Sequence, residues 1–276
     1  MLYPNLFKTM ETARWNMHSD IPWSSFDVTK VNHDQLNSIK MNAITEWSAL
    51  PATEMFLRDN QRDADFCAFI SIWFYEEMKH ALVLMEYLER FAPEYVPSEQ
   101  ELDKVRFTFD PAPALETLML HFCGEIRLTQ WYLRASQWHT EPVIRSIYNI
   151  ISKDEARHAG IYKQYMQRAI QRYGDDARLA FARIGVLMTS TKTGKALHPT
   201  NLHVCKAMYP DDTVQSRLTD PEWLDCWLNS QINFNNAWEE KVINGILINL
   251  SSLLSTPINN AKDLSRYRKS LSAITV

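Results

Sequence analysis

Apolar positions in the middle of the chain fall into segments of helical length, and proline, glycine and polar runs separate these segments. The pattern predicts four long helices, over residues 32–58, 63–91, 114–139 and 141–174. The second helix is apolar nearly all round between Phe66 and Tyr75, which is typical of the central helix of a bundle.

Capping and breaking residues mark the ends of these helices. Asn32 or Asp34 can cap the first helix, and we expect that helix to kink at Pro51, because proline cannot donate a backbone hydrogen bond. Pro142 can open the fourth helix, and Gly174 can end it as a C-terminal cap.

Residues 92–112 are rich in proline and predict a long crossover between two helix pairs. After the fourth helix, the sequence predicts a helix over residues 175–191, a loop-rich stretch over 192–212 and a last helix over 220–254. We therefore expect an all-α fold, a four-helix bundle with a long crossover and additional C-terminal helices.

The two ends of the chain are predicted to lack regular structure. We expect residues 1–30 to form an irregular, aromatic-rich arm over the bundle, and the final twenty residues to form a polar tail. We expect one domain over residues 1–276, with an arm (1–31), a core bundle (32–174) and accessory helices with a tail (175–276).

Composition narrows the class of protein. With 276 residues and 46% hydrophobic content the chain can bury a large core, while 6 glycines are too few for an all-β fold. A net charge of −4 gives no general attraction to nucleic acid or to anionic membranes.

Other features of the sequence indicate a cytoplasmic protein. The four cysteines show no close pairing, as expected for free thiols in a reducing compartment. No signal peptide is visible at the N-terminus, and the apolar stretch from Val242 to Leu254 is too short and too polar to span a bilayer.

Two Glu-x-x-His pairs, Glu77 with His80 and Glu155 with His158, carry the main chemical signal. Residues three apart share a helix face, so each pair can bind one metal ion. Two such pairs, with one glutamate from each of two further helices, form the ligand set of a di-iron or di-manganese carboxylate bundle.

The two further glutamates follow from hairpin geometry, because ligands at one depth lie equally far from the turn. Pairing Glu46 with Glu77 places the first turn near residue 61, and pairing Glu125 with Glu155 places the second at Thr140; both positions are turn-like. Pairing Glu54 with Glu77 would instead place the first turn within residues 65–69, a segment that we expect to be buried. The predicted ligands are Glu46, Glu77, His80, Glu125, Glu155 and His158.

The segment from Ala43 to Pro51 resembles the Ile-Thr-Glu…Ala-Leu-Pro signature of the soluble acyl-carrier-protein desaturases. Residues 76–80 are similar to the Glu-Glu-x-x-His of that family and residues 154–158 to its Asp-Glu-x-Arg-His. Glu125 falls where the family has its third-helix glutamate, and Trp15 is a looser match to the N-terminal arm.

This resemblance implies a ferritin-like fold with two iron ions, manganese being the alternative metal. It implies oxygen-dependent removal of two hydrogens from an acyl chain on a carrier protein, as part of fatty acid metabolism. It further implies electrons from a ferredoxin-type donor and a homodimer. The chain itself carries no flavin, haem or iron–sulfur motif that could supply the electrons.

Three residues are predicted to support the ligands. A metal-bound histidine normally donates its second ring N–H to an acceptor, for which Asp154 is the candidate, and Trp15 could extend that network to the surface. Desaturases of this type have a threonine three residues after the third-helix glutamate, where this chain has Leu128 followed by Thr129. Thr129 lies where bacterial multicomponent monooxygenases place their threonine.

The sequence therefore leaves two other functions open. One is a di-iron oxygenase, a hydroxylase or N-oxygenase, that inserts oxygen into a small or carrier-bound substrate. The other is an iron-handling protein without organic substrate. Basic residues after the fourth helix could contact an acidic carrier protein; these are Arg172, Arg178, Arg183, Lys192, Lys195 and Lys206.

Overall fold

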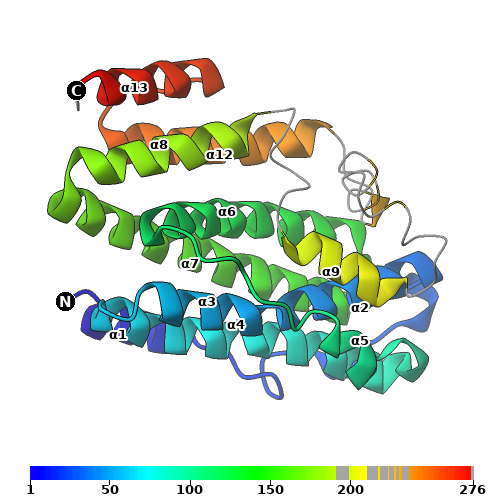
Figure 1. The fold of residues 1–276 in the computed structure, drawn as a ribbon. Coiled ribbons are helices and arrows are strands. Elements are labelled where there is room, and N and C mark those ends of the chain that lie inside the picture. Colours follow the sequence, from blue (N-terminus) through cyan, green and yellow to red (C-terminus); the bar gives the residue numbers. More distant parts are fainter. Residues whose placement is uncertain are drawn as a thin grey trace. The chain divides into compact units, whose positions relative to one another are not determined.

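The computed structural model describes residues 1–190, 199–209 and 236–274, together with residues 217, 223, 227, 230 and 231 (Figure 1). Within these residues all regular structure is helical, which confirms the predicted all-α class. The helices are α1 (Tyr3–Ala13), α2 (His33–Trp47), α3 (Ala49–Asp59), α4 (Ala64–Phe91), α5 (Glu99–Asp103), α6 (Ala114–Trp138), α7 (Pro142–Tyr173), α8 (Asp175–Thr189), α9 (Pro199–Met208), α12 (Asn236–Leu254) and α13 (Ala261–Ile274), with short 3-10 helices η1 (Trp23–Ser25), η2 (Val28–Lys30) and η3 (Pro93–Tyr95).

The chain divides into two compact units, and α6 and α7 each contribute residues to both. The first unit comprises the described residues within Met1–Asp110, Tyr132–Ser152 and Ala196–Phe234. The second comprises those within Pro111–Trp131, Lys153–Lys195 and Asn235–Val276. The predicted division into arm, core bundle and accessory helices stays a prediction.

Helix α4 is the centre of the first unit, where it packs against α1, α2 and α3. Its apolar side chains Phe69, Ile70 and Trp73 are buried, and Phe56 of α3 meets the Trp73 ring edge-on with centroids 5.6 Å apart. Burial of such aromatic residues supplies much of the energy that holds these helices together.

Helix α8 is the centre of the second unit, where it packs against α12 and α13. Gly185 of α8 lies against side chains of both α12 and α13. A Cβ atom there would stand 2.8 Å from side-chain carbons of both Leu250 and Leu264. The absence of a side chain at Gly185 therefore lets these helices approach one another.

The prediction of an irregular N-terminal arm is wrong for residues 3–13, which form helix α1. Asp65, in the first turn of α4, accepts hydrogen bonds from the backbone N–H groups of Leu2 (2.9 Å) and Tyr3 (3.1 Å). Leu6 and Met10, one turn apart, are buried. The carboxylate satisfies backbone donors that a helix leaves open at its N-terminus.

Two C-terminal predictions are also wrong. The expected polar tail forms α13, which buries Leu264 and Leu271 on one face. The expected loop over residues 192–212 contains α9. The last predicted helix ends at Leu254 as expected, whereas its predicted start at Asp220 lies outside the described residues.

Two helices, α2 and α3, replace the single kinked helix expected over residues 32–58. Asn32 caps α2 in a reciprocal capping box with Gln35, which confirms the predicted start. The break lies at Ser48, three residues before Pro51. Since Pro51 cannot donate to the carbonyl of Trp47, the helical hydrogen bonding is already incomplete at this point.

The remaining predicted elements agree closely with the structure. Helices α6 and α7 match the third and fourth predicted helices, and the crossover contains η3 and α5. Gly174 separates α7 from α8 with a φ of 57°, a conformation that favours glycine. Among the described helices, none combines the length and apolar character needed to cross a membrane.

Three cysteines lie in the described residues, and all are free thiols, as predicted: Cys67, Cys123 and Cys205. Burial raises the pKa of the Cys205 thiol to about 11, so this group stays protonated at neutral pH. Cys226 lies outside the described residues.

Candidate metal centre

Helices α2 and α4 bring together Glu46, Glu77 and His80. All three side chains are buried, with Glu46 3%, Glu77 4% and His80 0% exposed. Nδ1 of His80 lies 3.5 Å from Oε2 of Glu46 and 3.9 Å from Oε2 of Glu77. The i,i+3 spacing of Glu77 and His80 on α4 places both on one helix face.

Helices α6 and α7 bring together Glu125, Glu155 and His158 in the same way. Nδ1 of His158 lies 3.7 Å from Oε2 of Glu125 and 3.6 Å from Oε2 of Glu155. All three residues are buried. Each Glu-x-x-His pair therefore has one glutamate from another helix beside it.

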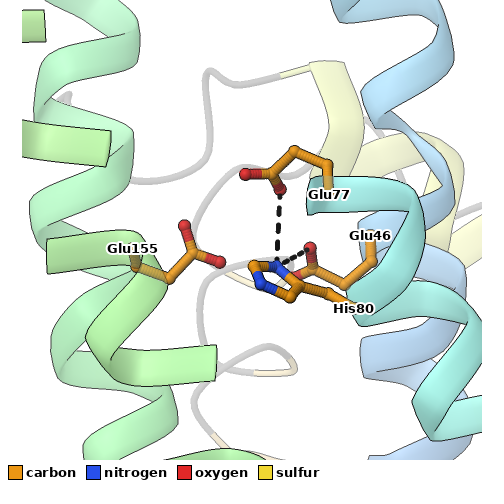
Figure 2. Close-up of side chains that lie close together, drawn as sticks. All are labelled: Glu46, Glu77, His80 and Glu155. Atoms are coloured by element: carbon orange, nitrogen blue, oxygen red, sulfur yellow. Dashed lines mark ion pairs between the residues drawn. The ribbon is translucent and has the colours of Figure 1, made fainter. Parts of the chain in front are cut away.

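The six residues form two overlapping groups in which one ligand atom from each member lies within 4.8 Å of all the others. Glu46, Glu77, His80 and Glu155 make up the first group, which Figure 2 shows with the Glu46 and Glu77 carboxylates directed at the His80 ring. Glu77, Glu125, Glu155 and His158 make up the second. Glu77 and Glu155 are common to both groups.

The ligand distances fit metal ions held between the side chains. At 3.5–3.9 Å, the carboxylate oxygens are too far from the imidazole nitrogens for good hydrogen bonds. Two ligand atoms that each bind one ion at about 2.1 Å lie roughly 3.0–3.4 Å apart, so a small contraction would create a site.

The burial of the carboxylates also indicates that these side chains can hold a metal ion. Oε2 of Glu46 is buried and makes no hydrogen bond within the described part of the chain. Uncompensated carboxylates in such surroundings are costly, whereas a divalent cation would neutralise them. Carboxylate and imidazole ligands suit iron, manganese and zinc. The buried Glu/His groups can thus hold a metal ion.

The pKa of the Glu125 carboxyl reflects two opposing influences. Burial alone raises this pKa, but contacts with His158 and Glu155 and the charge of His121 outweigh that effect and hold it below its ordinary value. The geometry thus favours the ionised form of Glu125, which is the form that binds a cation.

The rejected candidate Glu54 lies apart from this cluster. Its side chain is 58% exposed and forms an ion pair with Arg106 at 2.9 Å. The hairpin argument that preferred Glu46 over Glu54 therefore agrees with the structure.

Tyr132 is a residue of the site that the sequence interpretation missed. Its hydroxyl donates a hydrogen bond to Oε1 of Glu46, and the side chain is fully buried. Tyr132 lies seven residues, or about two helical turns, after Glu125 and hence on the same face of α6. That spacing could have identified it.

Asp154 and Trp15, the two predicted supporting residues, are both buried. Asp154 forms an ion pair with Arg157 at 2.8 Å. The carbonyl of Trp15 accepts a hydrogen bond from Nζ of Lys79 at 3.0 Å, and the same Nζ lies 4.1 Å from the centre of the Trp15 ring. Their predicted roles toward the ligand histidines stay predictions.

The hydroxyl of Thr129 donates to the backbone carbonyl of Glu125, 2.8 Å away and one turn earlier in α6. This is a common local bond for a helical threonine. Any part that Thr129 plays at the site therefore stays a prediction.

Ion pairs within the described part of the chain engage two of the basic residues suggested for carrier binding. Arg178 pairs with Asp175 at 2.9 Å and Arg183 with Glu116 at 2.6 Å. Lys192 and Lys195 lie outside the described residues.

Comparison of the sequence with models of known protein families and with curated proteins finds no match.

Proposed function

We propose that this protein is a di-iron oxidoreductase that uses dioxygen to desaturate an acyl chain carried on a carrier protein. The observation that carries the proposal is the pair of overlapping, buried groups, each with three carboxylates and one imidazole. Two such groups that share two carboxylates suit two neighbouring cations, with manganese as the alternative metal.

The ligands divide naturally between two ions. Glu46 and His80 would hold one ion, and Glu125 and His158 the other. Glu77 and Glu155 belong to both groups and are the candidates to bridge the ions. The helices that carry the six residues would be the four helices of a ferritin-like bundle: α2, α4, α6 and α7.

Bound iron would supply one-electron redox chemistry and a binding position for dioxygen. The protein's part is to hold the ligands rigidly and to keep water away from the reaction. In the overall reaction, dioxygen, two electrons and two protons take two hydrogens from a saturated chain and leave a double bond and two water molecules. A ferredoxin-type protein would deliver the electrons.

The choice of desaturation rests on the resemblance over residues 43–51, 76–80 and 154–158. In the structure these segments hold Glu46, the Glu77–His80 pair and the Glu155–His158 pair. The resembling segments thus carry five of the six candidate ligands. The resemblance also supports a carrier protein as partner and a homodimer. The free thiols of the described cysteines support a reducing compartment, for which we propose the cytoplasm.

Intact-protein mass spectrometry tests this proposal. Acyl carrier proteins bearing saturated chains of different lengths would be incubated with iron-loaded protein, dioxygen and a ferredoxin reducing system. Loss of two hydrogens from one acyl chain is the expected result. Glu77→Ala should abolish it, while Glu54→Ala, the matched exposed glutamate, should not.

The other outcomes separate the alternatives. Gain of one oxygen atom would contradict desaturation and identify a hydroxylase. Rapid iron oxidation with no organic product on any carrier would favour iron handling. If Glu77→Ala retained full activity, the proposed site would be wrong.

A further inference from the structure

The two oxygens of Glu46 have different partners. Oε1 accepts a hydrogen bond from the hydroxyl of Tyr132, and Oε2 lies 3.5 Å from Nδ1 of His80. Glu46 and Tyr132 are 3% and 0% exposed, so water does not compete for either oxygen. The carboxylate is therefore held in one orientation, with Oε2 toward the candidate ligand histidine.

Three helices fix the Tyr132 ring. It stacks on the ring of Tyr148 in α7, with centroids 5.7 Å apart and planes 17° from parallel. The hydroxyl of Tyr148 accepts a hydrogen bond from Nδ2 of Asn42 at 2.8 Å. Asn42 lies on α2, one turn before Glu46, so the contacts form a closed ring from α2 through α7 and α6 back to α2.

We propose that Tyr132 is a positioning residue that keeps Oε1 of Glu46 on its hydroxyl, so that Glu46 binds the metal through Oε2 alone. This inference rests on the proposed metal centre. For Glu46 to chelate an ion with both oxygens, the bond to Tyr132 would have to break. The buried phenol would then lose this hydrogen bond, and the stacked ring could not move away without disturbing Tyr148.

Ligation through one oxygen has a consequence for function. A chelating carboxylate occupies two coordination positions, whereas a carboxylate bound through one oxygen occupies one. Catalytic metal sites keep a position open for a reactant, while structural sites are closed. Tyr132 thus preserves an open position at the ion held by Glu46 and His80.

Cobalt substitution tests the inference without reference to activity. Cobalt(II) has visible absorption bands whose intensity falls as the coordination number rises. The full-length metal-free protein would be titrated with cobalt(II) without dioxygen, as wild type and as Tyr132→Phe. The variant frees Oε1, so the absorption of the ion at Glu46 and His80 should fall by about twofold as Glu46 becomes chelating, and the absorption averaged over two bound ions should fall by about a quarter.

Tyr87→Phe is the matched control. The hydroxyl of Tyr87 donates to Oε2 of Glu141 at 3.2 Å, and both residues are fully buried. Glu141 also accepts from the backbone N–H of Ile144 at 2.9 Å, and it belongs to neither ligand group. This variant therefore removes the same kind of bond without touching a ligand, and its cobalt spectrum should match the wild type.

A second variant covers the case in which Tyr132→Phe does not fold. With 4-fluorophenylalanine in place of Tyr132, the fluorine fills the volume of the hydroxyl but donates no hydrogen bond. The spectrum of this variant should change as that of Tyr132→Phe does. A wild-type spectrum in the fluorinated protein would mean that ring volume matters rather than the hydrogen bond, and would overturn the inference.

The results also separate this inference from the proposed function. A wild-type protein that binds no cobalt would overturn the metal centre and this inference with it. A wild-type cobalt spectrum that Tyr132→Phe leaves unchanged would overturn the role of Tyr132 alone. Equal changes in Tyr132→Phe and Tyr87→Phe would be a general packing effect and would also overturn it.

Discussion

Replacing Glu77 by glutamine should stabilise the metal-free protein, although glutamate is the residue that the chain carries. Glu46 and Glu77 each place an oxygen within 4.8 Å of the other members of one group. At that separation two unit charges repel by about 3.5 kcal/mol for an effective dielectric constant near 20. Glutamine carries no charge and removes this repulsion, while the loss of contacts made by the Glu77 carboxylate offsets part of the gain, so we expect Glu77→Gln to raise the free energy of unfolding by about 1–3 kcal/mol.

Metal ions should reverse the order of stability. An ion that binds only the folded state at 100 times its dissociation constant stabilises the protein by about 2.7 kcal/mol. Wild-type protein should gain at least that amount when iron(II) is added without dioxygen. Glu77→Gln, which lacks a carboxylate common to both groups, should gain much less.

Urea unfolding with and without a chelator measures both effects. Glu54→Gln is the control because this side chain is exposed and lies outside the groups, so its unfolding free energy should change by no more than about 0.5 kcal/mol. If Glu77→Gln destabilised the metal-free protein, the carboxylates would not be repelling one another and the electrostatic reasoning would fail.

Three further predictions concern stability. Burial lowers the pKa of His139 from 6.5 to about 3. As pH falls below 6.5, the imidazole of His139 therefore binds a proton in the unfolded chain but stays neutral in the folded protein. Unfolding of wild type should therefore become easier by about 2 kcal/mol between pH 7 and pH 5, and His139→Phe should remove that part of the pH profile; identical profiles would refute it. Gly185→Ala would press its Cβ to 2.8 Å from Leu250 and Leu264 and should cost about 1–3 kcal/mol in thermal unfolding, so an unchanged melting temperature would count against the tight packing. Asn32→Ala removes a helix cap and should cost about 1 kcal/mol in urea unfolding, while Asn32→Asp should cost little.

The candidate ligands could be predicted from the sequence because the spacing of residues along a helix determines which side chains share a face. Three-residue separation places a glutamate and a histidine on one helix face, whatever the rest of the fold does. Equal distance from a turn then selected Glu46 over Glu54, and the structure finds Glu46 buried in a ligand group and Glu54 exposed. Capping chemistry at Asn32 fixed the start of α2 equally well.

Sequence reasoning failed where tertiary contacts decide the outcome. Among the side chains that the structure describes, α1 buries only Leu6 and Met10, and α13 only Leu264 and Leu271. Isolated helices of this length are marginal in water, so neighbouring helices must stabilise both, and the carboxylate of Asp65 adds stability to α1. No local pattern contains that information.

The hydrogen bond of Tyr132 to Glu46 was missed for a related reason. The two residues are 86 positions apart, and a buried tyrosine on a long helix is ordinarily a core residue. In the sequence, only the position of Tyr132 on the same face of α6 as Glu125 points toward the site.

The iron content of the protein tests the central claim most directly. Metal-free protein would be titrated with iron(II) without dioxygen, freed of unbound metal and analysed by elemental mass spectrometry. We predict two iron ions per wild-type chain, fewer than one in Glu77→Ala and Glu155→Ala, and two in the control Glu54→Ala. Wild-type protein without bound iron, or full iron content in both ligand variants, would contradict the assignment of the site.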